Sequence, residues 1–159
     1  MPFIEIEQLS FSYRRKPFIH GLNLSIEEGG ILALLGPNGS GKTTILKLLL
    51  GLLAPLKGTI SIQGADMRLL SQRERAKKLA YVPQTHREAF GYSVYDVVLM
   101  GRLPHISFFS RYGESDRRIA AESIAKMGIQ HLAERPYTEI SGGERQLTLI
   151  ARALVLSFK

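Results

Sequence analysis

The chain has 159 residues, of which 45% are hydrophobic and 22% are charged, a composition typical of a globular domain and not of a disordered segment. It contains no cysteine, so a disulfide framework and thiolate metal sites are excluded, and a reducing compartment is expected. The net charge of +7 is compatible with nucleic acid, anionic lipid or a phosphate-bearing ligand, but the two dense basic clusters, 13–17 and 73–78, are expected to be solvated faces.

The chain begins with short strands. Residues 3–13 alternate in polarity and include β-branched and aromatic side chains, and residues 21–30 form a second strand that closes in a Glu-Gly turn. Residues 31–35, Ile-Leu-Ala-Leu-Leu, form a continuous apolar run, which is typical of a strand buried on both faces of a parallel sheet. The pattern therefore predicts three strands before residue 36.

A helix, a strand, a polar helix and another strand follow. The helix is expected over residues 41–51, ending at Gly51, and the strand over 58–64. Residues 71–78 read as a polar helix with Ser71 as its cap, and residues 79–84 as a further short strand. Alternating strands and helices predict an α/β fold.

No segment is expected to span a membrane. The most apolar stretch, 43–58, is interrupted by Lys47, Gly51 and Pro55, whereas a spanning helix needs about 20 apolar residues in a row. The N-terminus lacks the basic start and apolar centre of a signal peptide. A soluble intracellular protein is therefore expected.

The character of the sequence changes between residues 86 and 140, where helical spacing predominates. Residues 93–103 and 115–128 are predicted as helices, the second capped by Ser115 or Asp116 and ended by Gly128. This region is expected to be a small helical subdomain inserted into the α/β core.

A phosphate-loop pattern lies between the 31–35 strand and the 41–51 helix. Gly36 is followed after four residues by Gly41, Lys42 and Thr43. Glycines let the backbone wrap a phosphate chain, and the helix that follows directs its N–H groups and the positive end of its dipole at the anion. Lys42 is expected to contact the β- and γ-phosphates and Thr43 to bind Mg²⁺. A glycine-rich joint without a ligand is the alternative.

A second glycine motif, Ile-Ser-Gly-Gly-Glu-Arg-Gln, occupies residues 140–146 and precedes another helix-like pattern. Taken alone, a Ser-Gly-Gly turn at the start of a helix is expected to be only an N-cap. With the phosphate loop beside it, the chain resembles the nucleotide-binding subunit of ATP-binding cassette (ABC) transporters. The phosphate loop matches the Walker A motif of that family, Gln84 matches the Q-loop glutamine, and the second motif is similar to the signature motif, with Glu144 where glutamine is commoner. Tyr13 matches the aromatic residue that stacks on adenine, although an ordinary strand aromatic is the alternative.

The resemblance implies a head-to-tail dimer in which ATP lies between the phosphate loop of one copy and the signature motif of the other. Lys42 and Gln84 are implied as catalytic residues, and Thr43 and Gln84 as ligands of Mg²⁺. The nucleotide-binding residues that it implies are Tyr13, Gly36, Pro37, Asn38, Gly39, Ser40, Gly41, Lys42, Thr43, Thr44, Ser141, Gly142 and Gly143.

The resemblance also implies other partners. Residues 94–105 resemble the corresponding stretch of ABC importers for iron-siderophore complexes, haem or cobalamin. In those importers this stretch would face the membrane permease. Arg102 and His105 are expected either to contact the permease or to be plain surface residues. His105 is not expected to bind a metal. The chain would lie on the cytoplasmic face of the membrane and work indirectly with a substrate-binding protein.

In the family, the next segment is a strand that ends in Asp-Glu, which is called the Walker B motif. A histidine that senses the γ-phosphate follows it. This sequence has no Asp or Glu after Glu144 and no His after His131. We therefore expect a fragment with an incomplete core and impaired hydrolysis, in three parts: residues 1–85 from the ATP-binding core, the helical subdomain 86–140, and 141–159 with the signature motif. A non-hydrolysing nucleotide-binding module and a soluble ABC ATPase acting on DNA or ribosomes are the alternatives, although nucleic acid is not favoured because no nucleic-acid fold is recognisable.

Overall fold

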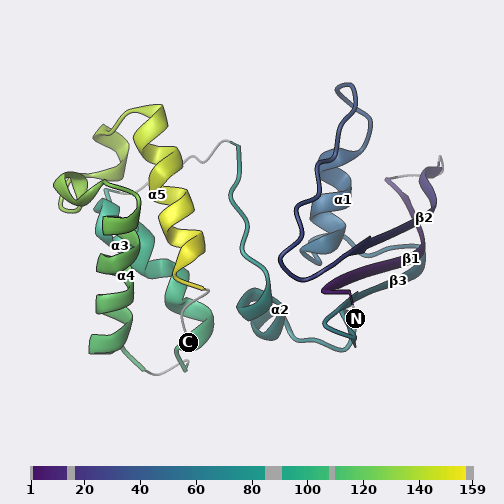
Figure 1. Ribbon diagram of the computed structural model, residues 1–159, viewed down its shortest axis with the longest axis horizontal. Coiled ribbons are helices and arrows are strands. Elements are labelled where there is room, and N and C mark those ends of the chain that lie inside the picture. Colours follow the sequence, from purple (N-terminus) through teal and green to yellow (C-terminus); the bar gives the residue numbers. More distant parts are fainter. Residues whose placement is uncertain (1, 14–16, 85–90, 108–109, 157–159) are drawn as a thin grey trace. The chain divides into compact units, whose positions relative to one another are not determined.

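The computed structural model describes residues 2–13, 17–84, 91–107 and 110–156. The chain divides into two compact units, Met1–Lys78 and Leu79–Lys159, each with strands or helices of its own (Figure 1). The three-part division expected from the sequence, with boundaries at 85 and 140, stays a prediction. No helix in the described ranges has the length and apolar character needed to cross a membrane.

The first unit is a four-stranded sheet with a helix beside it (Figure 1). The strand order is β2-β1-β3-β4, and each neighbouring pair is antiparallel. Its elements are β1 (Ile4–Ser12), β2 (Pro17–Ile26), α1 (Lys42–Leu49), β3 (Lys57–Ile62), β4 (Ala65–Asp66) and α2 (Gln72–Lys78). The two predicted N-terminal strands and both helices of this half are therefore confirmed, although the second strand is Pro17–Ile26 where 21–30 was predicted.

A bulge in β1 explains which of its residues form the core. Ile4 and Ile6 are buried before the bulge, and Leu9 and Phe11 are buried after it, so the inward positions change from even to odd numbers. Gln8, at the bulge, has a positive φ of 48°, and the register with both neighbouring strands shifts there. A bulge adds one residue to a strand and so returns the apolar positions to the same face of the sheet.

Two predicted strands are not formed. Residues 31–35 and 79–84 have no regular secondary structure, and no described residue pairs with either segment in a ladder. Ile31 is fully exposed and Leu35 is 91% exposed, where the sequence pattern predicted burial on both faces. A strand requires a hydrogen-bonded neighbour, so the apolar run alone does not produce one.

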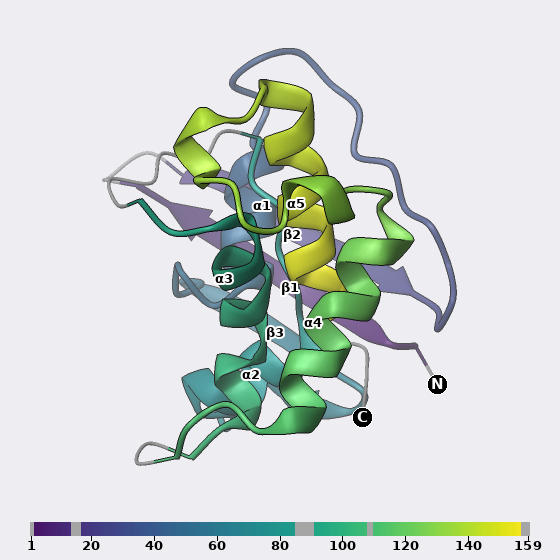
Figure 2. The same ribbon diagram turned by 90° about the vertical axis from the view of Figure 1, so that its left-hand side faces the viewer.

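The second unit is helical, and α3, α4 and α5 pack against one another (Figure 2). Their buried faces form one apolar cluster that includes Val97, Ile124 and Leu149, and Tyr137 from outside these helices joins it. The elements of this unit are α3 (Val94–Leu99), the 3₁₀ segments η1 (Met100–His105), η2 (Gln130–Leu132) and η3 (Tyr137–Glu139), α4 (Glu114–Lys126) and α5 (Gly142–Leu154).

Two boundaries in this unit differ from the sequence prediction. The helix predicted over 93–103 ends at Leu99 and continues as η1, because the chain packs closely on α5: a Cβ at Gly101 would lie 2.3 Å from the carbonyl oxygen of Arg152. Helix α4 begins after Gly113 and not after Ser115 or Asp116. Asp116 instead accepts a hydrogen bond from the Gly113 N–H at 3.0 Å.

Arg102 of η1 is buried, so the expectation of a plain surface residue is wrong, and its side chain joins three elements of this unit. Its side chain is 8% exposed, and its Nε donates to Oδ1 of Asp116 at 2.8 Å. One terminal nitrogen donates to the carbonyl oxygen of Val155, at the end of α5, also at 2.8 Å. Partial burial by itself would raise the pKa of Asp116, but the hydrogen bonds from Arg102 and from the Gly113 N–H lower that pKa below its usual value.

Candidate functional site

Residues 36–41 form a loop that leads directly into α1. The Ser40 N–H donates to the carbonyl oxygen of Pro37 at 3.2 Å, which closes a turn with Gly39 at a positive φ of 84°. Gly41 is the N-cap of α1 with a φ of 99°, and a Cβ there would lie 3.1 Å from the ring of Phe18. The glycine pattern of residues 36–41 therefore folds as a turned loop. A side chain at Gly41 would strain the backbone of that loop.

The start of α1 is suited to an anion. The N–H groups of Lys42, Thr43 and Thr44 occupy the first turn, where no intrahelical acceptor exists. The helix has no side-chain cap and no acidic residue in that turn. Unpaired N–H groups and the helix dipole therefore make this end electropositive.

Lys42 lies over the loop that precedes it. Its Nζ donates to the carbonyl oxygens of Gly36 at 2.8 Å and of Pro37 at 2.9 Å. The ammonium group is thereby held against the loop backbone and does not extend into solvent. It is placed to exchange these carbonyl oxygens for the oxygens of an anion in the same loop.

Tyr13 is brought to the same place from the end of β1. Its hydroxyl lies 3.1 Å from Oγ1 of Thr44, which is buried in the first turn of α1. The Tyr13 ring is 55% exposed and makes edge contacts with Phe11 and Phe18, with ring centroids 4.9 and 5.8 Å away. One exposed aromatic surface therefore stands beside the loop.

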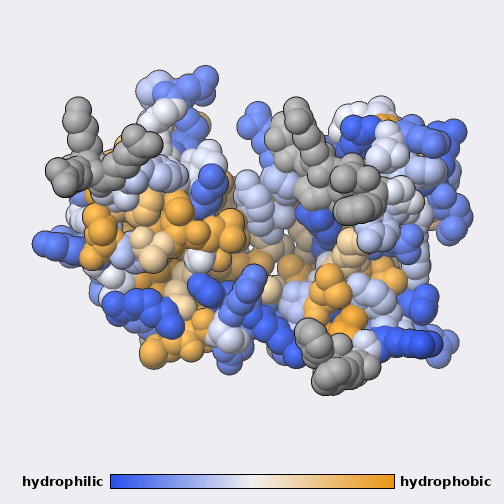
Figure 3. All heavy atoms as spheres, turned by 180° about the vertical axis from the view of Figure 1, so that it is seen from behind, coloured by the Kyte–Doolittle hydropathy of each residue, from blue (hydrophilic) through white to orange (hydrophobic). Residues whose placement is uncertain are grey.

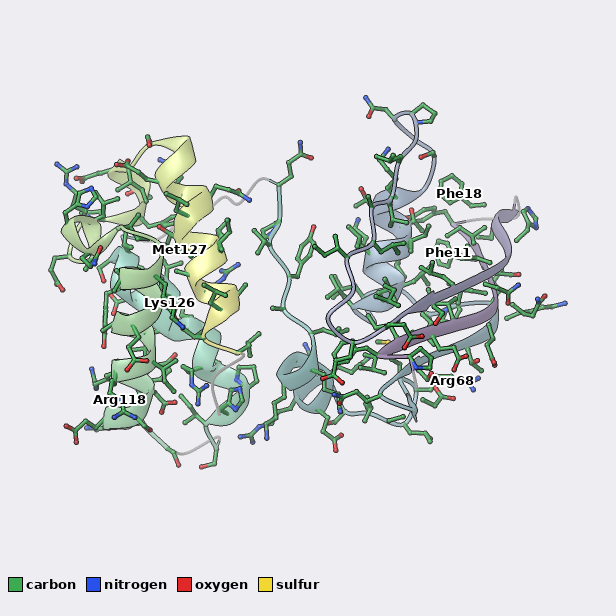
Figure 4. All side chains as sticks on the ribbon, in the orientation of Figure 1. Phe11, Phe18, Arg68, Arg118, Lys126 and Met127 are labelled. Atoms are coloured by element: carbon green, nitrogen blue, oxygen red, sulfur yellow. The ribbon has the colours of Figure 1, made fainter. Side chains whose placement is uncertain are left out.

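Phe18 is a site residue that the sequence analysis missed. It is 41% exposed, and it contacts both the Tyr13 ring and the Gly41 position; Phe11 and Phe18 lie beside α1 in Figure 4. Nothing in the pattern marks it, because an aromatic residue in a strand is ordinary.

The second glycine motif forms the start of α5 in the other unit. Ser141 is the N-cap: its Oγ accepts from the Glu144 N–H at 3.3 Å, and Oε2 of Glu144 accepts from the Ser141 N–H at 2.7 Å. The hydrogen bond from the Ser141 N–H and, after it, a side-chain hydrogen bond from Ser141 to the carboxylate lower the pKa of Glu144. Gly142 and Gly143 are exposed, and a Cβ on either would contact nothing. The turn therefore presents bare backbone N–H groups at a helix N-terminus.

Gln84 also belongs to the second unit and is exposed. The loop, Tyr13 and Thr44 are thus brought together within one unit, and Ser141 to Gly143 within the other. No cluster of three or more His, Asp or Glu side chains able to hold a metal ion occurs within residues 2–13, 17–84, 91–107 and 110–156.

Comparison with known proteins shows which family has the phosphate loop, Gln84 and the Ser141 turn in this order. The family model for ABC transporters matches residues 19–159, which include the loop, Gln84 and the Ser141 turn. The chain belongs to the ABC transporter family.

Three ABC proteins illustrate the similarity. The chain is 39% identical to a probable iron chelatin transport ATP-binding protein of Helicobacter pylori, over 96% of the chain and 60% of that protein. It is also 39% identical to a molybdate import ATP-binding protein of Haemophilus influenzae, over 98% of the chain and 57% of that protein. A solved structure described as a metal-chelate type ABC transporter in an inward-facing conformation is 37% identical, with a TM-score of 0.82 over 98% of the chain and 56% of that chain.

These matches confirm the predicted fold class, the P-loop nucleotide-binding domain of ABC ATPases. The chain spans about three fifths of the length of the curated relatives that it matches.

Proposed function

We propose that the chain binds ATP with Mg²⁺ through the 36–44 loop, as part of the energy-coupling subunit of an ABC importer. The observation that carries the proposal is the position of Lys42, whose Nζ bonds to the carbonyl oxygens of its own loop at the electropositive start of α1. A cation held at that point meets the negative charge of a phosphate chain wrapped by the loop.

Each residue of the first unit has a role in this proposal. The N–H groups from Asn38 to Thr44, apart from the Ser40 N–H that donates to Pro37, would hold phosphate oxygens, and Lys42 would neutralise charge at the β- and γ-phosphates. The Thr43 side chain is exposed at the first turn and supplies a hydroxyl oxygen, a ligand type that suits Mg²⁺. The exposed Tyr13 ring would stack on the base.

The second half of the site would come from another copy. The N–H groups of Gly142 and Gly143 are suited to a terminal phosphate that a partner's loop presents. Because Oγ of Ser141 already accepts from the Glu144 N–H, Ser141 would contact a phosphate by donating its hydroxyl hydrogen, which it would have to release from the Glu144 carboxylate. ATP would then join two copies head to tail.

Hydrolysis, the transported substrate and the membrane partners belong to the proposal for the whole protein. Gln84 would assist at the metal and the attacking water. A metal chelate is the substrate class that the iron chelatin relative and the metal-chelate transporter structure favour, and molybdate is the alternative, because the molybdate relative is equally similar. The partners would be permease subunits at the cytoplasmic face of the membrane and, indirectly, a substrate-binding protein.

A binding experiment tests the nucleotide site. A fluorescent ATP analogue with Mg²⁺ would be titrated into the 159-residue chain and into its Lys42→Ala variant, with Lys47→Ala as the matched control because Lys47 is an exposed lysine at the other end of α1. We expect Lys42→Ala to weaken binding at least about tenfold, since it removes charge-assisted bonds, and Lys47→Ala to change it less than about twofold. Equal affinity of the unsubstituted chain and Lys42→Ala would refute the site.

A further inference from the structure

The side chain of Thr44 faces an aromatic ring at the start of α1. Thr44 is 6% exposed, whereas Thr43, the residue before it, is exposed. The Oγ1 atom of Thr44 lies 3.1 Å from the hydroxyl oxygen of Tyr13, so the two hydroxyl groups share a hydrogen bond. The backbone N–H of Thr44, by contrast, belongs to the first turn of the helix, where no intrahelical acceptor exists. The two polar groups of this residue therefore serve different neighbours.

The Tyr13 ring is held from several sides, although it is 55% exposed. Phe11 meets it at 88° with the ring centroids 4.9 Å apart, and Phe18 meets it at 64° with the centroids 5.8 Å apart. Such edge contacts are a favoured geometry of aromatic pairs. The bond to Thr44 fixes the hydroxyl end of the same ring. Rotation of the Tyr13 side chain would break all of these contacts together.

Exposure alone would not distinguish this ring. Figure 3 shows apolar residues at the surface of each unit among charged ones, and scattered exposed apolar side chains are normal in proteins. Tyr13 differs from exposed leucines such as Leu52 and Leu69 because a hydrogen bond and two ring contacts hold it beside the electropositive end of a helix. The contacts, and not the exposure, indicate that the orientation of the ring matters.

We propose that Thr44 is a positioning residue for the base of the nucleotide. Its hydroxyl, through Tyr13, holds the ring in the orientation on which the base stacks, and this hydroxyl does not contact the phosphate chain. The inference rests on the proposed function, in which the 36–44 loop takes the phosphates and Tyr13 takes the base. A ring that is already held loses less conformational freedom when a base stacks on it, so the bond strengthens only the binding of ligands that carry a base.

A comparison of ATP with tripolyphosphate, which has a chain of three phosphates and no base, tests this role. Each ligand, with Mg²⁺, is titrated into the 159-residue chain by isothermal titration calorimetry. Thr44→Val keeps the shape of the side chain and removes the hydroxyl. We expect it to weaken ATP binding about fivefold and to change tripolyphosphate binding less than about 1.5-fold, since one neutral hydrogen bond is lost on the base side alone.

Two further variants check that the effect passes through Tyr13. Tyr13→Phe should show the same pattern as Thr44→Val, and the double variant should lose no more ATP affinity than either single variant, because both changes remove one and the same bond. Thr44→Ser retains the hydroxyl and should bind ATP within about twofold of the unsubstituted chain. The matched control is Thr59→Val on β3, which removes a hydroxyl that donates to the Glu7 carboxylate at 3.3 Å, and it should leave both affinities unchanged.

An equal loss of ATP and tripolyphosphate affinity in Thr44→Val would show that the hydroxyl contacts phosphate, and would overturn the proposal. A lower unfolding temperature with an unchanged ratio of the two affinities would leave the bond only a structural link between β1 and α1, and would overturn it as well. Circular dichroism checks folding, and if Thr44→Val does not fold, Tyr13→Phe at the exposed ring decides the same question. Equal ATP binding by Lys42→Ala and the unsubstituted chain would instead refute the proposed function, so the two failures are distinguishable.

Discussion

Replacement of Arg102 by methionine should destabilise the helical unit more than any exposed substitution in it. The methionine keeps much of the length of the side chain but removes the hydrogen bonds to Asp116 and to the Val155 carbonyl oxygen. It also leaves the Asp116 carboxylate, whose side chain is 14% exposed, without its cation. The end of α5 and the start of α4 then lose their common partner.

The expected loss in the free energy of unfolding is about 3 kcal/mol. A hydrogen bond to a charged group contributes about 1.5 to 3 kcal/mol, and breaking a buried ion pair costs about 3 to 5 kcal/mol. The lower end of the second range applies because Asp116 can still reach water. The matched control is Arg118→Met, since Arg118 is 75% exposed and lies 3.7 Å from Glu122, and its loss should stay below about 0.5 kcal/mol.

Urea unfolding followed by far-ultraviolet circular dichroism measures both variants, and hydrogen exchange of the α5 amides locates the effect. The pH dependence gives a second reading. Because the folded-state pKa of Asp116 is lowered, its stabilisation is full above the unfolded pKa and is lost as the pH falls through the folded pKa. The unsubstituted chain should therefore lose more stability in acid than Arg102→Met does. A loss in Arg102→Met no larger than that in Arg118→Met would refute this reasoning.

Three further predictions concern single groups. Gly41→Ala should cost about 1 to 3 kcal/mol in stability, because of its φ of 99° and the contact with Phe18, and should weaken ATP-analogue binding; unchanged thermal unfolding and affinity would contradict this. Ser141→Ala should cost about 1 kcal/mol through loss of the α5 cap, seen as faster amide exchange in its first turn and not in its last. Ser123→Ala should raise stability by about 1 kcal/mol, since the buried Ser123 hydroxyl has no hydrogen-bond partner within the described ranges; a lower unfolding temperature would show that it has one.

The sequence predicted the elements that local signals specify. The glycine spacing predicted the phosphate loop and α1. Ser71 indicated the start of α2, and Gly128, with its φ of 70°, indicated the end of α4. The N-cap role of Ser141 followed from residue type alone. In each case the decisive contacts lie within a few residues along the chain.

What sequence reasoning missed depends on contacts between distant segments. The apolar run 31–35 predicted a buried strand, but strand formation requires a neighbour, and the described residues provide none. The break after Leu99 depends on how closely Gly101 approaches Arg152. Phe18 entered the candidate site only because β2 pairs with β1 and brings its ring to Gly41. The site roles of the Gly36–Thr44 loop and the Ser141 turn stay predictions until the binding experiments are done.

The hydrogen bonds of Lys42 to its own loop bear on how a ligand would leave. If no carbonyl oxygen lay nearby, the ammonium group of such a lysine would have to exchange the oxygens of a departing anion for water. Here the carbonyl oxygens of Gly36 and Pro37 lie within 2.9 Å and can receive the ammonium group at once. In the proposed function, these two bonds would solvate the ammonium group after an anion leaves, which would narrow the free-energy difference between the bound and the free loop and favour repeated exchange over permanent retention.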